Sequence, residues 1–332
     1  MTPVATLILS LAPVGTALIL VLLPQLLPPG FMTSQVRLQT GSTRKVPQIG
    51  GIAITMTIVI GALMASAAGA VTSAGLPVLI AAIACVWLLG MVDDLTHPGA
   101  LPKLVVQLAV TGAVAWLLYR LSVPLPVLPL VVTGLVWFMN MVNFMDGMDM
   151  MGPVGLGIPL AFAGAILTMH APDSSAGMMA LLAAAALGGF LPINLPPARA
   201  YLGDNGSLVL GLVSGIAALE LCLKVNVAAA ILPFGYYLAD SLSTLLRRAI
   251  AGENIFKAHT SHAYQMARKR GHREIWVMAH VGLVGLVLGG LAVVAASAGP
   301  ALAGGLVVVG IALCGLLVLR LRGKIRFHNR HP

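Results

Sequence analysis

The chain has 332 residues, of which 59% are hydrophobic and only 9% are charged. Soluble domains carry about 25% charged residues, so the 19 basic and 10 acidic side chains could not cover a soluble domain of this size. The hydrophobicity also excludes a disordered chain, and strands of alternating polarity, which a membrane β-barrel needs, are not evident. The sequence therefore predicts an all-α, polytopic integral membrane protein.

Apolar segments of spanning length follow one another along the whole chain. A helix needs about 20 apolar residues to cross the hydrocarbon core of a bilayer. Such segments lie near residues 4–27, 52–70, 76–92, 103–120, 124–142, 153–170, 176–195, 206–222, 225–246, 275–297 and 301–319. We therefore expect ten or eleven transmembrane helices in a single membrane-embedded domain, residues 1–332.

The basic residues predict the orientation of these spans. If eleven spans alternate, 17 of the 19 Lys and Arg side chains fall on one face, and only Arg120 and Lys224 fall on the other. The positive-inside rule makes the basic face cytoplasmic, with the N-terminus outside and the C-terminus inside. The cytoplasmic face then holds a basic, histidine-containing loop at 247–274 and a basic tail at 320–332. The basic surplus is explained by topology and lipid headgroups, so we expect no nucleic-acid partner.

Most of the carboxylates also fall on the predicted cytoplasmic face, although the positive-inside rule does not require it. Asp93 and Asp94 end the third span, and Asp204 opens the eighth within the sequence LGDNGS. A helix N-terminus favours anions, whereas carboxylates favour hard divalent cations. The pattern therefore indicates a cation and phosphate site. Solvated helix ends and a simple helix cap are the structural alternatives.

A second acidic motif follows the fifth span. Asn143, Asp146 and Asp149 are spaced by three residues, so one helical turn would place them on one side. Polar groups in this apolar setting need partners, which favours a ligand site over a polar turn.

Basic residues near these motifs suit phosphate groups. Lys45 precedes the pair Gly50-Gly51 and could contact a diphosphate or simply set the topology. His259 and His262 lie in the sequence HTSHAYQ, which lacks the cysteines or HExxH motif of a zinc site. A phosphate-facing loop fits these residues better than a zinc site, and contact with lipid headgroups is the alternative.

Six motifs occur in the order found in one known family. They are KxPxxGG at Lys45, the Asp93-Asp94 pair followed by Lys103, NFMDGMD, LGDNGS, the region of Asp240 and the loop ending at His262. By these motifs the chain resembles the polyprenyl-phosphate N-acetylhexosamine-1-phosphate transferases. The HTSHAYQ loop differs from the tighter histidine cluster of many members. It is similar to the branch that initiates O-antigen or other surface polysaccharides.

The resemblance implies a reaction and its setting. A sugar 1-phosphate would pass from a UDP-N-acetyl sugar to undecaprenyl or another polyprenyl phosphate, with release of UMP. The implied cofactor is Mg²⁺, with Mn²⁺ as an alternative. The implied location is the bacterial inner membrane, with the active site on the cytoplasmic face. A homodimer is one possible assembly.

The resemblance also implies the roles of individual residues. Asp204 would be the leading metal ligand, while Asp93 and Asp94 would complete the metal site or orient and deprotonate the lipid phosphate. The implied substrate-binding residues are Lys45, Lys103, Asn143, Asp146, Asp149, His259 and His262.

Two other function classes are alternatives to this hypothesis. A transporter would place polar residues near the bilayer midplane, commonly in repeated halves, and neither feature is evident. A CDP-alcohol phosphotransferase would carry an Asp-Gly-x-x-Ala-Arg motif, which the sequence after Asp146 does not match.

Overall fold

The computed structural model describes residues 1–28, 30–37, 43–71, 75–172, 174–254 and 259–325. Within these ranges, ten helical segments are long and apolar enough to cross a membrane, which confirms the all-α, polytopic fold. Their helices are α1 Pro3–Leu26, α2 Gly50–Ala67, α3 Leu76–Thr96, α4 Ala100–Val114, α5 Leu128–Met145, α6 Gly157–His170, α7 Ser175–Asn194, α8 Asp204–Lys224, α12 Glu274–Ala296 and α13 Pro300–Leu321. Short irregular helices extend three of them: η1 Ala115–Tyr119 after α4, η2 Leu125–Val127 before α5 and η3 Met151–Leu156 before α6.

Helix α8 lies at the centre of the bundle, in contact with α2, α3, α5, α6 and α7. Its glycines allow this close packing, because small residues let the backbones of membrane helices approach one another. A Cβ atom on Gly211 would lie 2.5 Å from the Cα of Met139 in α5, and one on Gly206 would lie 2.6 Å from the Cα of Gly51 in α2. The central helix therefore has its N-terminus held between several neighbours.

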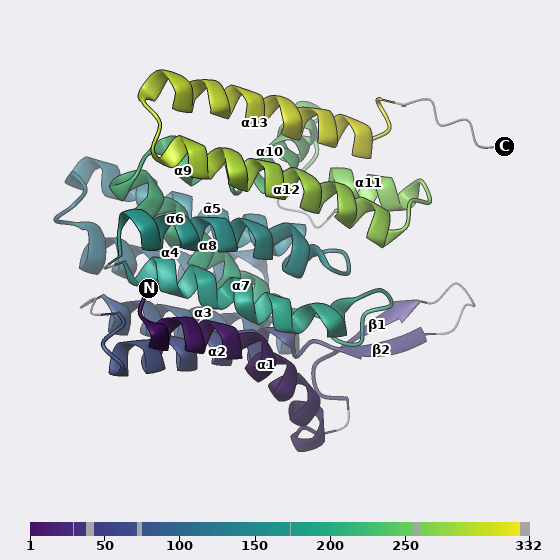
Figure 1. Cartoon of the computed structure of the whole chain (residues 1–332). Coiled ribbons are helices and arrows are strands. Elements are labelled where there is room, and N and C mark those ends of the chain that lie inside the picture. The colour runs from purple at the N-terminus through teal and green to yellow at the C-terminus, as the bar shows by residue number, and fades with distance from the viewer. Residues whose placement is uncertain (29, 38–42, 72–74, 173, 255–258, 326–332) are drawn as a thin grey trace.

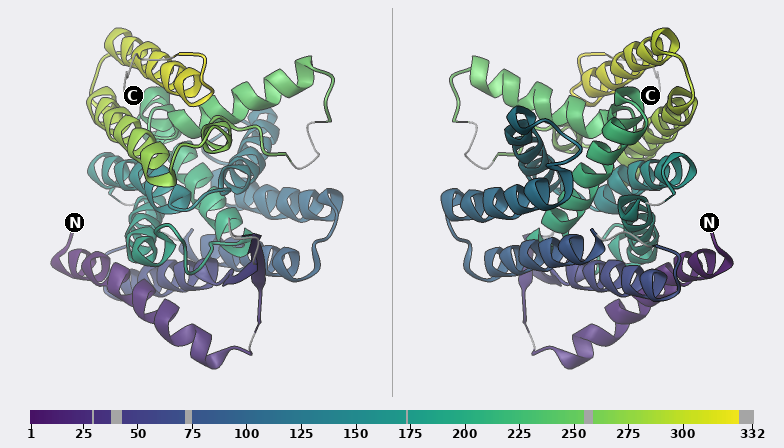
Figure 2. Two further views of the ribbon diagram at one scale, coloured as in Figure 1. Left: turned by 90° about the vertical axis from the view of Figure 1, so that its right-hand side faces the viewer. Right: turned by 90° about the vertical axis from the view of Figure 1, so that its left-hand side faces the viewer.

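The expectation of one continuous span over 225–246 is wrong. This segment forms two helices, α9 (Val227–Ile231) and α10 (Gly235–Ile250), separated by a turn that contains Pro233. Proline lacks a backbone N–H and cannot continue the hydrogen-bonding pattern of a helix. Figure 2 shows α10 projecting away from the other helices. Its outer face exposes Leu242, Leu246 and Ile250.

The broken segment still returns the chain to the end of the bundle where α8 begins. Helix α8 runs from Asp204 to Lys224, and α9 and α10 lead back toward α11 (Ala263–Lys269). For this reason the N-terminus and the end of α13 lie at opposite ends of the bundle, although ten segments have spanning length (Figure 1). The predicted N-out, C-in orientation stays a prediction, and residues 326–332 of the basic tail lie outside the described ranges.

A two-stranded antiparallel hairpin, which was not predicted, joins α1 to α2. Strand β1 (Thr33–Arg37) pairs with β2 (Thr43–Pro47) in a register that places Gln35 opposite Lys45. The backbone N–H of Tyr201 donates to the carbonyl of Pro47 at 2.9 Å, which fixes the hairpin to the segment before α8. The hairpin, α11 and the start of α8 therefore share one end of the bundle (Figure 1).

Candidate active site

Three helices bring two of the predicted carboxylates and one predicted lysine together. The Nζ atom of Lys103, in the first turn of α4, lies 2.6 Å from Oδ2 of Asp93 at the end of α3. The same Nζ atom lies 3.5 Å from Oδ2 of Asp204, the first residue of α8. Asp93 is buried, whereas 29% of the Asp204 side chain is exposed. Both carboxylates therefore face the ammonium of Lys103, and the site is exposed on the side of Asp204.

Asp94 has different partners from its neighbour. Its Oδ1 accepts from the backbone N–H of Asp204 at 2.9 Å, and its Oδ2 accepts from the backbone and side-chain nitrogens of Asn205 at 3.0 and 2.7 Å. The first N–H groups of a helix have no partner within the helix, and a negative charge there is stabilised by the helix dipole. Asp94 therefore holds the N-terminus of α8 in place. Its oxygens are directed to backbone and amide groups rather than to the Lys103 position.

Glycines allow the polar backbone groups to meet at this point. Gly203 has a φ of +76°, which favours glycine, and a Cβ atom on it would lie 2.8 Å from Oδ2 of Asp94. A Cβ atom on Gly51 would lie 2.2 Å from Oδ1 of Asn205. The Nδ2 of Asn205 also donates to the carbonyl of Gln48 at 3.2 Å. The glycines of KxPxxGG and LGDNGS are therefore explained by the contact between α2 and α8.

Asn143, Asp146 and Asp149 do not share one helical turn, because α5 ends at Met145. This corrects the sequence-based expectation. Asn143 still lies in the helix and donates to Oγ of Ser207 at 2.9 Å, whereas Oδ2 of Asp149 accepts from the backbone N–H of Ala198 at 3.0 Å. Asn143 thus contacts the first turn of α8, and Asp149 contacts the segment before it.

Asp146 lies between these two residues in a partly buried position. Burial, together with the negative charges of Asp94 and Asp149, raises the pKa of Asp146 to about 7. This carboxyl group can therefore hold a proton near neutral pH and donate a hydrogen bond.

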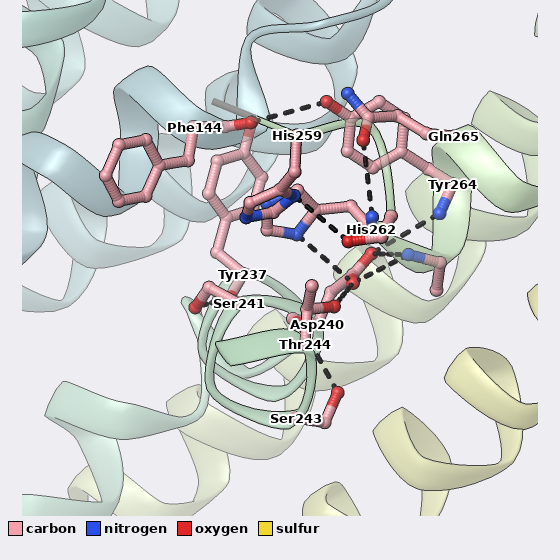
Figure 3. Close-up of polar contacts among 12 residues, drawn as sticks. Phe144, Tyr237, Asp240, Ser241, Ser243, Thr244, His259, His262, Tyr264 and Gln265 are labelled. Atoms are coloured by element: carbon pink, nitrogen blue, oxygen red, sulfur yellow. Dashed lines mark hydrogen bonds and ion pairs between the residues drawn. The ribbon is translucent and has the colours of Figure 1, made fainter. Parts of the chain in front are cut away.

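The two predicted loop histidines lie side by side. Their ring centroids are 5.0 Å apart, and Nδ1 of His259 lies 3.1 Å from Oγ of Ser261. His262 is almost fully buried, with Nδ1 3.5 Å from Oδ1 of Asp240 (Figure 3). Burial and the positive surroundings that include Arg248 lower the pKa of His259 to about 4, so its imidazole is neutral at neutral pH.

Lys45 is the predicted site residue that lies apart from the others. Its side chain is exposed on β2, and it takes part in none of the ion pairs among the described residues. The neighbouring Arg44 instead donates to the carbonyl of Ala198. The role of Lys45 in binding phosphate stays a prediction.

Sequence reasoning missed three residues of this region and gave no role to a fourth, Asp240. Gln48 lies with its Nε2 3.5 Å from Oδ1 of Asp94, and Asn205 is the side-chain partner of the same carboxylate. Tyr264 and Asp240 connect the histidine loop to the rest of the structure. All four residues stand inside the six motifs or the quoted HTSHAYQ sequence, so the motifs held the signal, but the pairings join distant parts of the chain.

The oxygen donors near Lys103 fit the implied Mg²⁺. Within the described ranges, no group of three or more His, Cys, Asp or Glu side chains is arranged to hold a metal ion. Mg²⁺, however, is usually held by one or two carboxylates together with water and substrate phosphates. Asp93 and Asp204 face a common cationic position and supply such a pair.

Comparison with known proteins identifies the family. Residues 76–222 match the model of glycosyl transferase family 4. The chain is 30% identical over 294 residues to decaprenyl-phosphate N-acetylglucosaminephosphotransferase of Mycobacterium tuberculosis, covering 74% of this chain and 71% of that protein. The chain belongs to glycosyl transferase family 4. This membership confirms the resemblance inferred from the motifs and favours a transferase over the transporter and CDP-alcohol alternatives.

The names of two further relatives mention different transferred groups. A protein of Bacillus subtilis named probable undecaprenyl-phosphate N-acetylglucosaminyl 1-phosphate transferase is 27% identical over 282 residues, covering 77% of this chain and 76% of its own length. The phospho-N-acetylmuramoyl-pentapeptide-transferase of Staphylococcus carnosus is 33% identical over 177 residues, covering 51% and 53%. The protein is a multi-pass inner-membrane enzyme of a family that generally depends on a divalent metal.

Proposed function

We propose that this enzyme takes sugar 1-phosphate from a UDP-N-acetylated sugar and passes it to undecaprenyl phosphate or a similar polyprenyl phosphate. Sugar-1-phosphate transfer to polyprenyl phosphate is the activity of the family. The observation that carries the assignment is the convergence of Asp93, Lys103 and Asp204 at one end of the bundle. A lipid phosphate from the bilayer and a nucleotide from the cytoplasm can meet at such a position.

The proposed reaction needs positioning and neutralisation of charge more than covalent chemistry by the protein. An oxygen of the acceptor phosphate attacks the sugar-bearing phosphorus of the UDP-sugar and forms a new diphosphate bond. The old diphosphate bond breaks, and UMP leaves. The ammonium of Lys103 lies where it can contact these phosphates, and Asp93 orients that ammonium at 2.6 Å.

We assign the implied Mg²⁺ to Asp204 and Asp93. When bound, the ion would neutralise the charge that develops on the diphosphate. Asp94 was expected to be a second metal ligand, but its oxygens accept hydrogen bonds from the start of α8. We therefore propose that Asp94 positions Asp204.

A cavity of about 830 Å³ supports the proposed lipid acceptor. Its walls are almost entirely apolar and come from α5, α8, α9, α10, α12 and α13. The lining includes Val127, Gly134, Leu219, Leu238, Leu242 and Ile311. Ser243, near the C-terminal half of α10, also lines it. We propose that this cavity holds the polyprenyl chain.

The nucleotide sugar is proposed to occupy the other side of the carboxylate pair, between the 143–149 motif and the histidine loop. A protonated Asp146 and a neutral His259 suit a diphosphate there, because the first adds no negative charge and both can hydrogen-bond. The HTSHAYQ sequence supports an N-acetylated hexosamine or deoxyhexosamine donor for a surface polysaccharide.

The test is UMP release from membranes supplied with polyprenyl phosphate, Mg²⁺ and a panel of UDP-sugars. Asp204→Asn should lower kcat by about 100-fold or more, as expected for loss of a charge that stabilises the transition state. The variant keeps the backbone N–H that bonds to Asp94, so α8 should still form. Glu253→Gln, which alters an exposed acid paired with Arg248, is the control and should keep its activity. Full activity in Asp204→Asn would refute the metal assignment, and no UMP from any UDP-sugar would refute the proposed donor.

A further inference from the structure

Asp240 is a fully buried carboxylate outside the cluster around Lys103. It lies in α10, and its oxygens are directed at the first turn of α11. The backbone N–H of Ala263 lies 2.8 Å from Oδ1 and 3.0 Å from Oδ2, and that of Tyr264 lies 3.4 Å from Oδ2. Because these N–H groups have no partner within α11, Asp240 caps this helix from a different part of the chain.

Other donors complete the surroundings of this carboxylate. The hydroxyls of Tyr236 and Thr244 each lie 3.1 Å from an Asp240 oxygen, and Nδ1 of His262 lies 3.5 Å away. The guanidinium of Arg322, just after α13, lies 4.0 Å from Oδ1 and donates to the Thr244 hydroxyl at 2.6 Å. Burial alone would raise the pKa of Asp240, but His262 and the donors of α11 hold it below its usual value. Asp240 therefore stays ionised and joins three elements of the structure.

Tyr264 carries this connection to the acidic motif after α5. Its ring is fully buried, and its hydroxyl donates to the carbonyl of Phe144 at 3.4 Å. A Cβ atom on Gly147 would lie 2.4 Å from the same hydroxyl, so the 143–149 segment packs directly on Tyr264. The rings of Tyr264 and His262 are stacked with centroids 5.9 Å apart. The first turn of α11 therefore touches both groups that we assign to the nucleotide sugar.

We propose that Asp240 is a positioning residue for the nucleotide-sugar half of the active site. It fixes the start of α11, and α11 in turn holds His262 beside His259 and holds Tyr264 against the 143–149 motif (Figure 3). Asp240 itself does not contact substrate, because it is fully enclosed. This inference rests on the proposed assignment of the loop and the motif to the UDP-sugar.

The arrangement predicts a selective kinetic effect. The cluster around Lys103 comes from α3, α4 and α8, whereas the partners of Asp240 come from α10, α11 and the residue after α13. The apolar side chains of Leu238 and Leu242 face the proposed lipid cavity from the same helix. Loss of the Asp240 charge at constant side-chain size should therefore loosen α11 without changing the cavity wall.

The experiment is a steady-state comparison of Asp240→Asn with the wild type, varying each substrate in turn. The amide would direct an N–H group toward backbone N–H groups, and loss of this charge-assisted cap should raise KM for the UDP-sugar about tenfold. KM for the polyprenyl phosphate should not change. Tyr264→Phe, which removes only the hydroxyl that reaches Phe144, should raise the same KM by a smaller factor. Asp240→Glu, which restores the charge, should recover part of the lost affinity.

Glu220→Gln is a matched control for the general cost of altering a buried carboxylate. Glu220 in α8 accepts from the hydroxyls of Tyr119 at 3.1 Å and Ser174 at 2.5 Å, at the opposite end of the bundle. This variant should lower the thermal unfolding midpoint in detergent and leave both KM values unchanged.

Three outcomes would overturn the proposal: an unchanged KM for the UDP-sugar in both Asp240→Asn and Tyr264→Phe, equal rises in both KM values, or the same kinetic pattern in Glu220→Gln. If Asp240→Asn fails to fold, the KM values of Tyr264→Phe and Asp240→Glu still test the proposal. Failure of the proposed function would look different, because the wild type itself would then release no UMP from any UDP-sugar.

Discussion

The adjacent carboxylates of Asp93 and Asp94 differ because neighbouring residues of a helix point in different directions. Asp93 is directed at the ammonium of Lys103, and Asp94 is directed at the backbone of Asp204 and Asn205. The sequence predicted that two adjacent acids have separate roles. It could not predict which acid has which role, because the partners of Asp94 stand about 110 residues further along the chain.

Asp146 makes the stability of the folded protein depend on pH. Between pH 3.8 and about 7, the folded protein keeps a proton on Asp146 that the unfolded chain has released. The folded state binds more protons in this range, so this group lowers the free energy of unfolding as pH rises. Asp146→Asn removes the effect. The thermal unfolding midpoint of the variant minus that of the wild type should increase between pH 4 and about 7. Above about pH 7 this difference should stay constant. A difference that does not change with pH, or that falls as pH rises, would contradict this prediction.

The ends of the helices, rather than their apolar middles, determine the active site. The segments at the starts of α2 and α8 meet through backbone hydrogen bonds, and the carboxylate of Asp94 joins the end of α3 to the start of α8. The N–H groups of Gly50 and Gly51 donate to the carbonyls of Tyr201 and Leu202, each at 2.9 Å. The position of Asp204 therefore depends on the close contact between α2 and α8.

Gly51→Ala tests this contact. The added Cβ atom would lie 2.2 Å from both Oδ1 of Asn205 and the backbone nitrogen of Gly206, so the helices must separate. Overpacking of this kind costs about 1–3 kcal/mol, and UMP release should fall further because Asp204 moves. Gly188→Ala in α7 is the control, since its Cβ atom meets nothing within 4 Å. Thermal unfolding and activity are measured for both variants, and equal behaviour would refute the proposed contact.

Much of the fold was predictable because hydrophobicity alone determines which segments enter a bilayer. All ten spanning segments lie where the sequence placed them. The prediction of one span over 225–246 was wrong because this apolar stretch, although long enough to cross a membrane, is interrupted by a turn that contains Pro233. The hairpin of β1 and β2 gave no apolar signal. At the site, motif order indicated the participants, but the end of α5 at Met145 changed how the 143–149 motif lies.

At the scale of the whole molecule, the bundle separates two chemical environments. The apolar cavity is lined by α5, the central helix α8 and the helices α9, α10, α12 and α13, whereas the carboxylates around Lys103 lie at one end of the bundle. A long isoprenoid tail and a water-soluble nucleotide can then approach the reaction site without sharing a path. Under the proposed function, this separation would let one chain use substrates of such different polarity.

Gly134→Phe tests the lipid side of this arrangement. Gly134 lines the cavity, and a Cβ atom there meets nothing within 4 Å, so the new ring can enter the cavity without moving the backbone. KM for a long-chain polyprenyl phosphate should rise about tenfold, through loss of about 1.4 kcal/mol of binding. A short-chain acceptor should be affected less. Gly112→Phe in α4, with equal free space but no part in the cavity, should leave both KM values unchanged. Equal effects of the two variants would refute the assignment of the cavity.

The bond between Asp94 and the start of α8 has a consequence for biosynthesis. The ribosome completes α3 about 110 residues before it makes Asp204 and Asn205. At about 5–20 residues per second, the carboxylate of Asp94 waits about 5–20 seconds for its partners. During this interval α5, α6 and α7 are made without the central helix that they will contact. Insertion of α8 is therefore the event in synthesis that first brings Asp93, Lys103 and Asp204 together, and a chain stopped before it would hold Asp93 and Asp94 without their partners in α8.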